Sequence, residues 1–364
     1  MKIVFFGNAP EKIAAIRYRI QTFARMLEAE GHTCVVCLPS SVALQARLYD
    51  NKSRASKLFY LFLVWLRRWA QLRHVPGADV VYFRGSLFLY GPPLFERIAR
   101  LLNPRLIFDI DDAVWEPPDY VDSPFVRFID FDWVPKMARI CRHAVVGNEY
   151  LAQHVRTLMP CVTIIPTCID LDKHTPKEIG AIGPIPSTVT LGWTGLHTNL
   201  GYLDHIAPVI QELAAKYPIR MVVATGRPYH LDGVEVENHA WTLAHEIDYL
   251  RAADIGLMPL EDSPCARGKC AFKALQYMGV GVPVVLSPVG MNVEAVEDGV
   301  SGFFADTPEE WREKLERLIA DPGLRLRMGQ AARERVAERY SHAVNYPVLK
   351  RVLEAVAQEK QPPC

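Results

Sequence analysis

Short apolar runs alternate with helical patterns along most of the chain, and this alternation restricts the fold more than any other feature of the sequence. In the first half, runs typical of buried parallel strands fall at 2–6, 33–38, 79–83, 105–109, 144–147 and 162–165. Helical patterns lie between them, near 14–30, 58–73, 91–102, 124–141 and 149–158. Strands that alternate with helices in this way predict a doubly wound α/β domain.

A second series of the same kind follows a stretch rich in proline and glycine at 174–187, a composition typical of a linker. Strands fit 188–193, 220–224, 236–240, 254–258, 283–286 and 302–305. Helices fit 199–216, 245–251, 269–278, 292–297 and 309–320, and two more amphipathic helices lie near 323–338 and 343–358.

We therefore expect two Rossmann-like domains, 1–173 and 188–340, joined by the linker at 174–187. The helix near 343–358 is a candidate to pack back on the first domain. Two such domains are expected to face a central cleft at the C-terminal ends of both sheets, where ligands bind in folds of this kind.

Charge and hydropathy exclude some classes of protein. The 364 residues carry a formal net charge of zero, so nothing global argues for a nucleic-acid partner. No apolar run reaches the roughly 18 residues of a membrane span, and a strand pattern begins directly after Lys2 where the charged region of a signal peptide would lie. We expect a cytoplasmic protein.

Residues 268–286 form a helical pattern, then a tight turn, then an apolar strand. If Lys269–Met278 is helical, Lys269, Lys273 and Gln276 share one face, and the opposite face is apolar. Two cations and an amide near a helix N-terminus suit a diphosphate. The alternative is an ordinary solvated face.

The same segment carries matches to a known family, which continue on both sides of it. The matching residues are Ala253–Pro259, Gln276–Gly279, Gly281, Pro283–Val285, Ser287–Gly290, Glu294, Asp298–Gly299 and Gly302–Phe303. Over about 245–306 the chain resembles the donor-binding segment of retaining GT-B glycosyltransferases of family 4, also called glycosyl transferases group 1. The resemblance implies a GT-B fold, with donor binding in the second domain and acceptor binding in the first.

The chain departs from the family where two glutamates usually stand eight positions apart. The second usually holds the nucleotide ribose and the first contacts the donor sugar. Here these positions are Gln276 and Gly268. Gln276 can still bind hydroxyls, whereas Gly268 supplies no side chain, so Lys269 is a candidate for that contact.

Further donor-binding candidates lie at other strand ends. Gly195 ends the first strand of the second domain and lets a ligand approach the backbone, and Thr198 or Asn199 can cap the next helix. Glu246 is expected near the nucleobase, by the resemblance, and Glu294 near the diphosphate or ribose. Arg17 follows the first strand of the chain; it is equally well read as a surface cation.

Three carboxylates end the fourth strand, in the run Asp109-Ile110-Asp111-Asp112, and they repel one another unless cations balance them. Asp111 or Asp112 is a candidate to orient or deprotonate an acceptor hydroxyl, and Trp115 to stack on a sugar ring. A helix cap and a divalent-metal site are the alternatives. The two-domain pattern disfavours the metal, so we expect none.

Residues 52–73 read KSRASKLFYLFLVWLRRWAQLR, a nine-residue apolar run with cations at both ends. Between 52 and 105 there are ten Lys or Arg against two acids, Asp79 and Glu96. Apolarity around the whole circumference, with cations and Trp, predicts an interfacial helix on an anionic membrane. The alternative is a helix buried on its sheet.

Together these features predict a retaining, metal-independent hexosyltransferase that uses a UDP- or GDP-sugar as substrate and no cofactor. Asp111, Asp112, Lys269 and Lys273 are its candidate catalytic residues. The acceptor hydroxyl is expected on a sugar or lipid-linked molecule of cell-envelope polysaccharide or glycolipid assembly. The alternatives are a nucleotide-sugar-binding GT-B protein without turnover, motivated by the loss of both glutamates, and a GT-B sugar-nucleotide epimerase.

Overall fold

The computed structural model describes residues 1–50, 52–116, 128–177 and 188–358. They form two compact units. Unit 1 comprises Met1–Cys168 together with the C-terminal segment that begins at His342, and unit 2 comprises Ile169–Ser341. Of the expected linker 174–187, the first four residues belong to unit 2, and 178–187 lie outside the described residues.

Unit 1 is built on a six-stranded parallel sheet with the order β2-β1-β3-β4-β5-β6. Its strands are β1 (Lys2–Gly7), β2 (Thr33–Cys37), β3 (Val80–Arg84), β4 (Leu106–Ile110), β5 (His143–Val146) and β6 (Val162–Ile164). The central strands β3, β4 and β5 are buried along their whole length, as continuous apolar runs require of a sheet covered on both faces.

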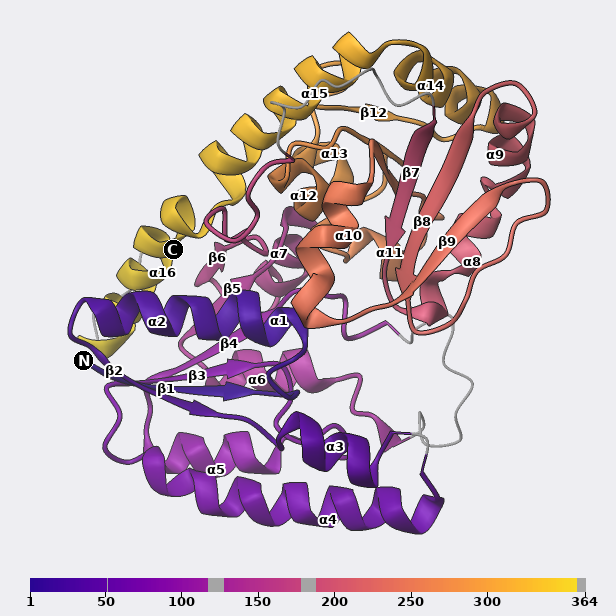
Figure 1. Cartoon of the computed structure of the whole chain (residues 1–364). Helices are drawn as coiled ribbons and strands as arrows, with labels where there is room; N and C mark the ends of the chain where they lie inside the picture. The colour runs from indigo at the N-terminus through magenta and orange to yellow at the C-terminus, as the bar shows by residue number, and fades with distance from the viewer. Residues whose placement is uncertain (51, 117–127, 178–187, 359–364) are drawn as a thin grey trace. The chain divides into compact units, whose positions relative to one another are not determined.

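The helices of unit 1 form the two outer layers (Figure 1). They are α1 (Ala14–Ile16), α2 (Thr22–Ala29), α3 (Val42–Leu48), α4 (Arg54–Gln71), α5 (Leu94–Leu102), α6 (Trp133–Ile140), α7 (Glu149–Arg156) and α16 (His342–Ala357), with a π-helical turn at Arg17–Gln21 between α1 and α2. α2 and α16 cover one face and share a core with Phe5, Tyr82 and Ile107. α4 and α5 lie side by side on the other face.

Unit 2 repeats this plan with the strand order β12-β11-β10-β7-β8-β9, again parallel. Its strands are β7 (Val189–Thr194), β8 (Ile219–Thr225), β9 (Glu235–Ala240), β10 (Ile255–Met258), β11 (Val284–Leu286) and β12 (Gly302–Phe304). Its helices are α8 (Gly201–Asp204), α9 (Ala207–Ala214), α10 (Glu246–Ala252), α11 (Pro264–Arg267), α12 (Phe272–Gly279), α13 (Asn292–Ala295), α14 (Pro308–Ala320) and α15 (Pro322–Arg335), followed by a π-helical turn at Val336–Tyr340.

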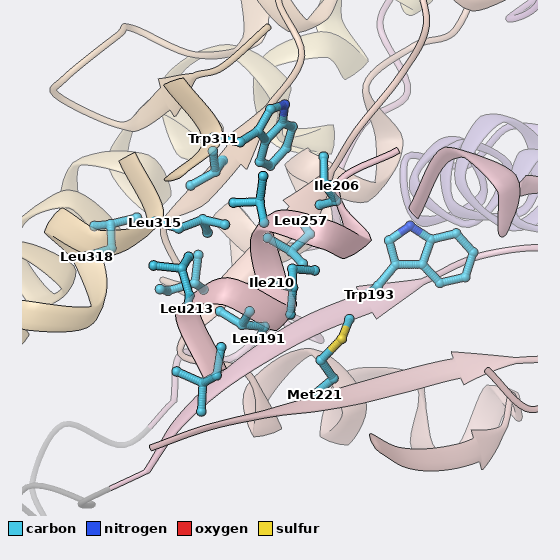
Figure 2. Packing of buried hydrophobic residues seen from close by; sticks show 14 of the residues in the cluster. Leu191, Trp193, Ile206, Ile210, Leu213, Met221, Leu257, Trp311, Leu315 and Leu318 are labelled. Carbon is cyan, nitrogen blue, oxygen red and sulfur yellow. The ribbon is translucent and has the colours of Figure 1, made fainter. Parts of the chain in front are cut away.

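One core of unit 2 lies between the sheet and helices α9 and α14. Figure 2 shows Leu191 and Leu257 from the strands meeting Ile210, Leu213 and Leu315 from the helices. Trp193, at the C-terminal end of β7, belongs to the same cluster and is 1% exposed. The apolar core thus reaches the edge of the sheet where the loops begin.

The expected α/β fold is confirmed, and every expected strand lies within one residue of an observed one at each end. The helices agree less closely: α3 and α11 were not expected, the expected helix 199–216 is divided into α8 and α9, and the helix expected at 269–278 begins only at Phe272. In the helix expected at 124–141, 124–127 lie outside the described residues and α6 begins at Trp133. None of the described helices has both the length and the hydrophobicity needed to span a bilayer.

Candidate functional site

The structure brings together two of the expected donor-site residues, Gly195 after β7 and Lys273 in the first turn of α12. A Cβ on Gly195 would lie 2.7 Å from Cε and 3.0 Å from Nζ of Lys273. The ammonium of Lys273 also lies 4.7 Å from the ring centre of Trp193, a cation–π distance. The missing side chain at Gly195 therefore leaves the space that Lys273 occupies at the end of the sheet.

Lys273 is half-buried, and among the described residues no carboxylate pairs with it. Burial and the nearby charge of Lys269 lower the pKa of Lys273 to about 7. A desolvated cation next to a second cation favours a bound anion, because an anion would restore the electrostatic balance that burial removes.

Lys269 does not lie on the same helix as Lys273, which corrects the expected stripe. It follows α11, and α12 begins only after Ala271, which has a left-handed backbone with φ of 50°. Ala271 is the single non-glycine residue with positive φ in the described part of the chain. Such a conformation costs about 1 kcal/mol and is often found at functional sites. The reversal still leaves the charge of Lys269 close enough to act on Lys273.

Gln276 is buried rather than aligned with the two lysines on an open face. Its Nε2 donates to Oε1 of Glu246 at 3.2 Å, which joins α12 to the start of α10. Two residues predicted separately, one for the ribose and one near the nucleobase, are therefore direct neighbours. Gly268 is also buried, between α11 and Lys269.

The other predicted donor residues lie on short elements. Thr198 is exposed and lies in a single 3-10 turn. Neither Thr198 nor Asn199 caps a helix, because the N-cap residue of α8 is Leu200, and no side chain accepts a hydrogen bond there. The expected second helix start at this loop is thus only one turn followed by a four-residue helix. Glu294 is an exposed residue of α13 whose backbone carbonyl accepts from Tyr340 and Arg335.

In unit 1, the carboxylates after β4 are balanced by two arginines, as their mutual repulsion requires. Arg19, which is 2% exposed, donates from Nε to Oδ2 of the fully buried Asp109 at 2.9 Å, and its Nη1 donates to the carbonyl of Ile165 at 2.8 Å. Arg84 from β3 forms an ion pair with Asp111 and lies 4.0 Å from Asp109. The sequence showed the need for these cations, but not their identity.

Asp111 and Asp112 differ in their surroundings. Burial disfavours the charge of Asp111, but Arg84 and Arg19 outweigh it and hold the pKa of Asp111 below its ordinary value. A carboxylate stabilised in this way is a weak base. Asp112, by contrast, is exposed to solvent.

One face of Trp115 is covered by His154, with ring centres 3.9 Å apart. Arg17 is half-buried, and its guanidinium lies 4.9 Å from the ring centre of Tyr18.

Helix α4 is not apolar around its whole circumference, which corrects the expectation for 52–73. Tyr60, Val64, Arg68 and Gln71 form a buried face. Arg68 is fully buried and donates to the carbonyls of Gly7, Leu87 and Cys37, so it is part of the core of unit 1. The opposite face is solvent-exposed and apolar, with Leu58, Phe59, Phe62, Leu66 and Trp69 each 42–58% exposed.

No group of three His, Cys, Asp or Glu side chains able to hold a metal ion occurs among the residues that the structure describes. The groups that gather at the candidate donor site are instead cationic and amide side chains at the end of β7 and the start of α12.

Residues 188–321 match the family model described as glycosyl transferases group 1. A curated relative, D-inositol 3-phosphate glycosyltransferase from Corynebacterium jeikeium, is 26% identical over 249 residues, which cover 56% of this chain and 57% of the relative. The chain thus spans about half the length of this relative. The matched segment includes Gly195, Lys269, Lys273 and Gln276.

The fold agrees with solved glycosyltransferase structures over almost the full chain. Sucrose-phosphate synthase from Thermosynechococcus elongatus has a TM-score of 0.72 at 14% identity and covers 99% of this chain and 100% of its own. HepE from Anabaena, solved in complex with UDP, has a TM-score of 0.69 at 15% identity over 98% of this chain and 100% of its own. The chain therefore has the GT-B fold, and its residues 188–321 resemble the glycosyl transferases group 1 family.

Proposed function

We propose that this protein is a retaining glycosyltransferase that moves a hexose from a nucleoside diphosphate sugar to an acceptor hydroxyl. The observation that carries the proposal is the half-buried Lys273, which lies against Gly195 and Trp193 at the end of β7 with Lys269 nearby. Retention rests on the family resemblance alone.

In the proposed mechanism, the donor diphosphate lies against Lys273, Lys269 and the N-terminus of α12. When the bond between the sugar and the diphosphate breaks, negative charge grows on the leaving oxygen. A cation held in a partly desolvated site stabilises that charge more strongly than one in water. The diphosphate in turn favours the protonated form of Lys273 and raises its pKa above the free value of about 7.

The buried pair of Gln276 and Glu246 is the proposed contact for the ribose and base of the donor. Hydrogen-bonding groups of fixed orientation bind hydroxyls at low entropic cost. A UDP- or GDP-sugar is the proposed donor, and the UDP complex of HepE supports the uridine form by analogy of fold. Gly195, Thr198, Glu294 and Arg17 stay candidates for further donor contacts.

Unit 1 is proposed to bind the acceptor. The exposed Asp112 is the candidate base for the acceptor hydroxyl, while Asp111, paired with Arg84, is proposed to position the loop. We propose transfer that needs no metal ion, because two lysines and a helix N-terminus can balance the diphosphate. Excess EDTA should therefore leave the rate nearly unchanged, and a rate that collapses and is restored by Mg²⁺ or Mn²⁺ would contradict this.

The exposed apolar face of α4 supports attachment to the cytoplasmic side of a membrane, in polysaccharide or glycolipid assembly. Phe59, Leu66 and Trp69 lie on this face, and Arg54, Arg67 and Arg73 are exposed near it. Apolar side chains bordered by cations suit the interface of an anionic bilayer. Arg68 takes no part, because it is buried.

Vesicle co-sedimentation tests this attachment. The double variant Arg67→Glu with Arg73→Glu should abolish the preference for vesicles of 30% phosphatidylserine over neutral vesicles. Each cation near an anionic surface contributes about 1 kcal/mol to the binding free energy. The matched control is Arg317→Glu with Arg327→Glu, which reverses two exposed cations of unit 2. Equal binding by both double variants would contradict membrane attachment through α4.

Two other functions share this fold, and one assay separates them. Loss of both family glutamates at Gly268 and Gln276 motivates a nucleotide-sugar-binding protein without turnover. A sugar-nucleotide epimerase would use the same donor. Incubation with UDP-, GDP-, ADP- or TDP-sugars together with an acceptor that carries a free hydroxyl should release a nucleoside diphosphate and join the sugar to that hydroxyl if the protein is a transferase. An epimerase would change the sugar but keep it attached, and a binding protein would leave the nucleotide sugar intact.

A further inference from the structure

Unit 1 contains a cavity of about 340 Å³ at the C-terminal ends of β1 and β3, bordered by Asn8 and Gly85. Its walls include five aromatic side chains, Tyr49, Tyr60, Phe88, Tyr90 and Trp133. Ligands of α/β sheets bind at this end of the strands. Aromatic walls with a few polar groups are typical of sites for small organic ligands.

Two side chains of this cavity, Gln45 and Asp130, each carry one hydrogen-bond acceptor that lacks a donor among the described residues. Oε1 of Gln45 and Oδ2 of Asp130 are shielded from solvent and receive no hydrogen bond from the described residues. Among the described residues that line the cavity there is neither lysine nor arginine. An uncharged ligand that donates hydroxyl hydrogens fits this lining, and a phosphorylated one does not, because buried phosphate needs cations or many donors.

A second, apolar groove of about 460 Å³ adjoins the cavity and shares Leu61, Phe88 and Tyr90 with it. The rest of its lining consists of Gly91, the Trp65 indole and the hydrocarbon side chains of Leu58, Phe62 and Phe128. Three of these side chains are at least half exposed to solvent: Leu58 at 58%, Phe62 at 53% and Phe128 at 50%. Exposed apolar surface of this kind is costly in water and marks a site that another apolar group covers.

The position of the groove on α4 identifies its occupant. Its exposed lining residues Leu58 and Phe62 continue into the apolar face of α4, and the half-buried Lys57 stands beside Tyr49 of the cavity with Nζ 5.4 Å from the ring centre. The surface is therefore apolar along the groove and hydroxyl-binding at the inner end, where Lys57 stands beside Tyr49, and the exposed Arg54 and Arg67 of α4 lie near its apolar face. That order of properties matches an amphiphile whose hydrocarbon chain enters from an anionic bilayer.

We infer that the acceptor is a glycolipid, with its uncharged sugar in the cavity and its hydrocarbon chain in the groove lined by Leu58, Phe62 and Phe88. The inference rests on the proposed glycosyltransferase function and names the substrate class for its acceptor half. It differs from the phosphorylated inositol in the name of the curated relative.

Titration of the full chain with butyl, hexyl and octyl β-D-glucoside, each below its critical micelle concentration, tests the inference. Full burial of one methylene raises affinity by about fourfold. We expect octyl glucoside to bind at least tenfold tighter than butyl glucoside. Phe62→Ser and Phe88→Ser should remove this dependence on chain length.

The matched control is Leu101→Ser, which alters an apolar side chain 86% exposed on α5 outside the groove. It should keep the dependence on chain length. Equal binding of the butyl and octyl forms, no binding of either, or loss of the dependence in Leu101→Ser would overturn the inference. So would a dimer, seen by light scattering, that Phe62→Ser dissociates while chain length has no effect.

Titration of the same proteins with nucleotide sugars separates the two levels of the proposal. If donor binding is intact and chain length has no effect, only the glycolipid inference fails. If no nucleotide sugar binds or is consumed, the proposed function fails and the acceptor role fails with it.

Discussion

The side chain of Lys273 passes directly over Gly195, so that a Cβ at position 195 would lie 2.7 Å from Cε of the lysine. This relationship joins the end of β7 to the start of α12 and fixes one cation at the C-terminal edge of the sheet. Because the atom in conflict belongs to a flexible side chain, a change at Gly195 should displace the lysine and leave the fold intact.

Gly195→Ala is therefore expected to weaken nucleotide-sugar binding by about tenfold, equivalent to one displaced charged hydrogen bond of about 1.5 kcal/mol. Calorimetry measures the affinity, and thermal denaturation checks the fold. Gly201→Ala is the control, because a Cβ at position 201 meets nothing within 4 Å. Equal affinities for the two variants would mean that Lys273 does not contact the donor.

Binding of a nucleotide sugar should take up a proton near neutral pH. The free protein has a Lys273 pKa of about 7, and the bound diphosphate raises that pKa. Affinity should thus be constant below pH 7 and fall by up to about tenfold per pH unit above it, until the pKa of the complex is reached. A nucleotide sugar is the proper ligand because its phosphates do not titrate in this range.

Calorimetry in buffers of different ionisation enthalpy measures the proton uptake directly. Lys273→Arg should keep most of the affinity but lose both the proton uptake and the decline above pH 7, since arginine stays protonated. An unchanged pH profile in this variant would assign the titration to another group.

The buried contact between Gln276 and Glu246 predicts the outcome of restoring the glutamate that the family usually has at position 276. Gln276→Glu places two carboxylates at hydrogen-bond distance in a buried site, and we expect a loss of about 1–3 kcal/mol in unfolding free energy. The double variant Gln276→Glu with Glu246→Gln exchanges the two groups and should recover most of it. Urea denaturation measures both. A stable single variant would show that the pair is not in contact.

The ion pair of Arg19 and Asp109 should be essential to the stability of unit 1. Asp109→Asn leaves a buried guanidinium without its counter-charge, which typically costs about 3–5 kcal/mol. Asp112→Asn, three residues away and exposed, should change the unfolding free energy by no more than about 0.5 kcal/mol. If both variants unfold at the same urea concentration as the wild type, this account of the carboxylate run is wrong.

The strands could be predicted closely from the sequence because a sheet covered on both faces demands continuous apolar runs, and such runs are visible in one dimension. Helix starts were less visible. Ala271 adopts a left-handed backbone conformation, which an alanine in the sequence does not predict. As a result, α12 begins three residues later than the lysine pattern suggested. Lys269 consequently lies outside α12, although its charge is close enough to lower the pKa of Lys273.

Long-range pairings were the other limit. Arg19 lies 90 residues from Asp109 and Arg68 lies 61 residues from the Gly7 carbonyl that it binds. Local patterns cannot distinguish an arginine that is buried by such partners from one in solvent, so the sequence alone groups Arg68 with the cations that flank the apolar run in 52–73. The cavity and groove of unit 1 likewise depend on side chains from α3, α4, α6 and the loops between them.

The most direct test of the central claim is the affinity of wild type and Lys273→Ala for UDP- and GDP-sugars, measured by calorimetry at pH 6.5, where the lysine is mostly charged. We predict that the wild type binds at least one of these donors and that Lys273→Ala, with an unchanged fold, binds it about 10–100-fold more weakly, the loss of one charged contact. Equal affinity of the two proteins for that donor would contradict the diphosphate site proposed here.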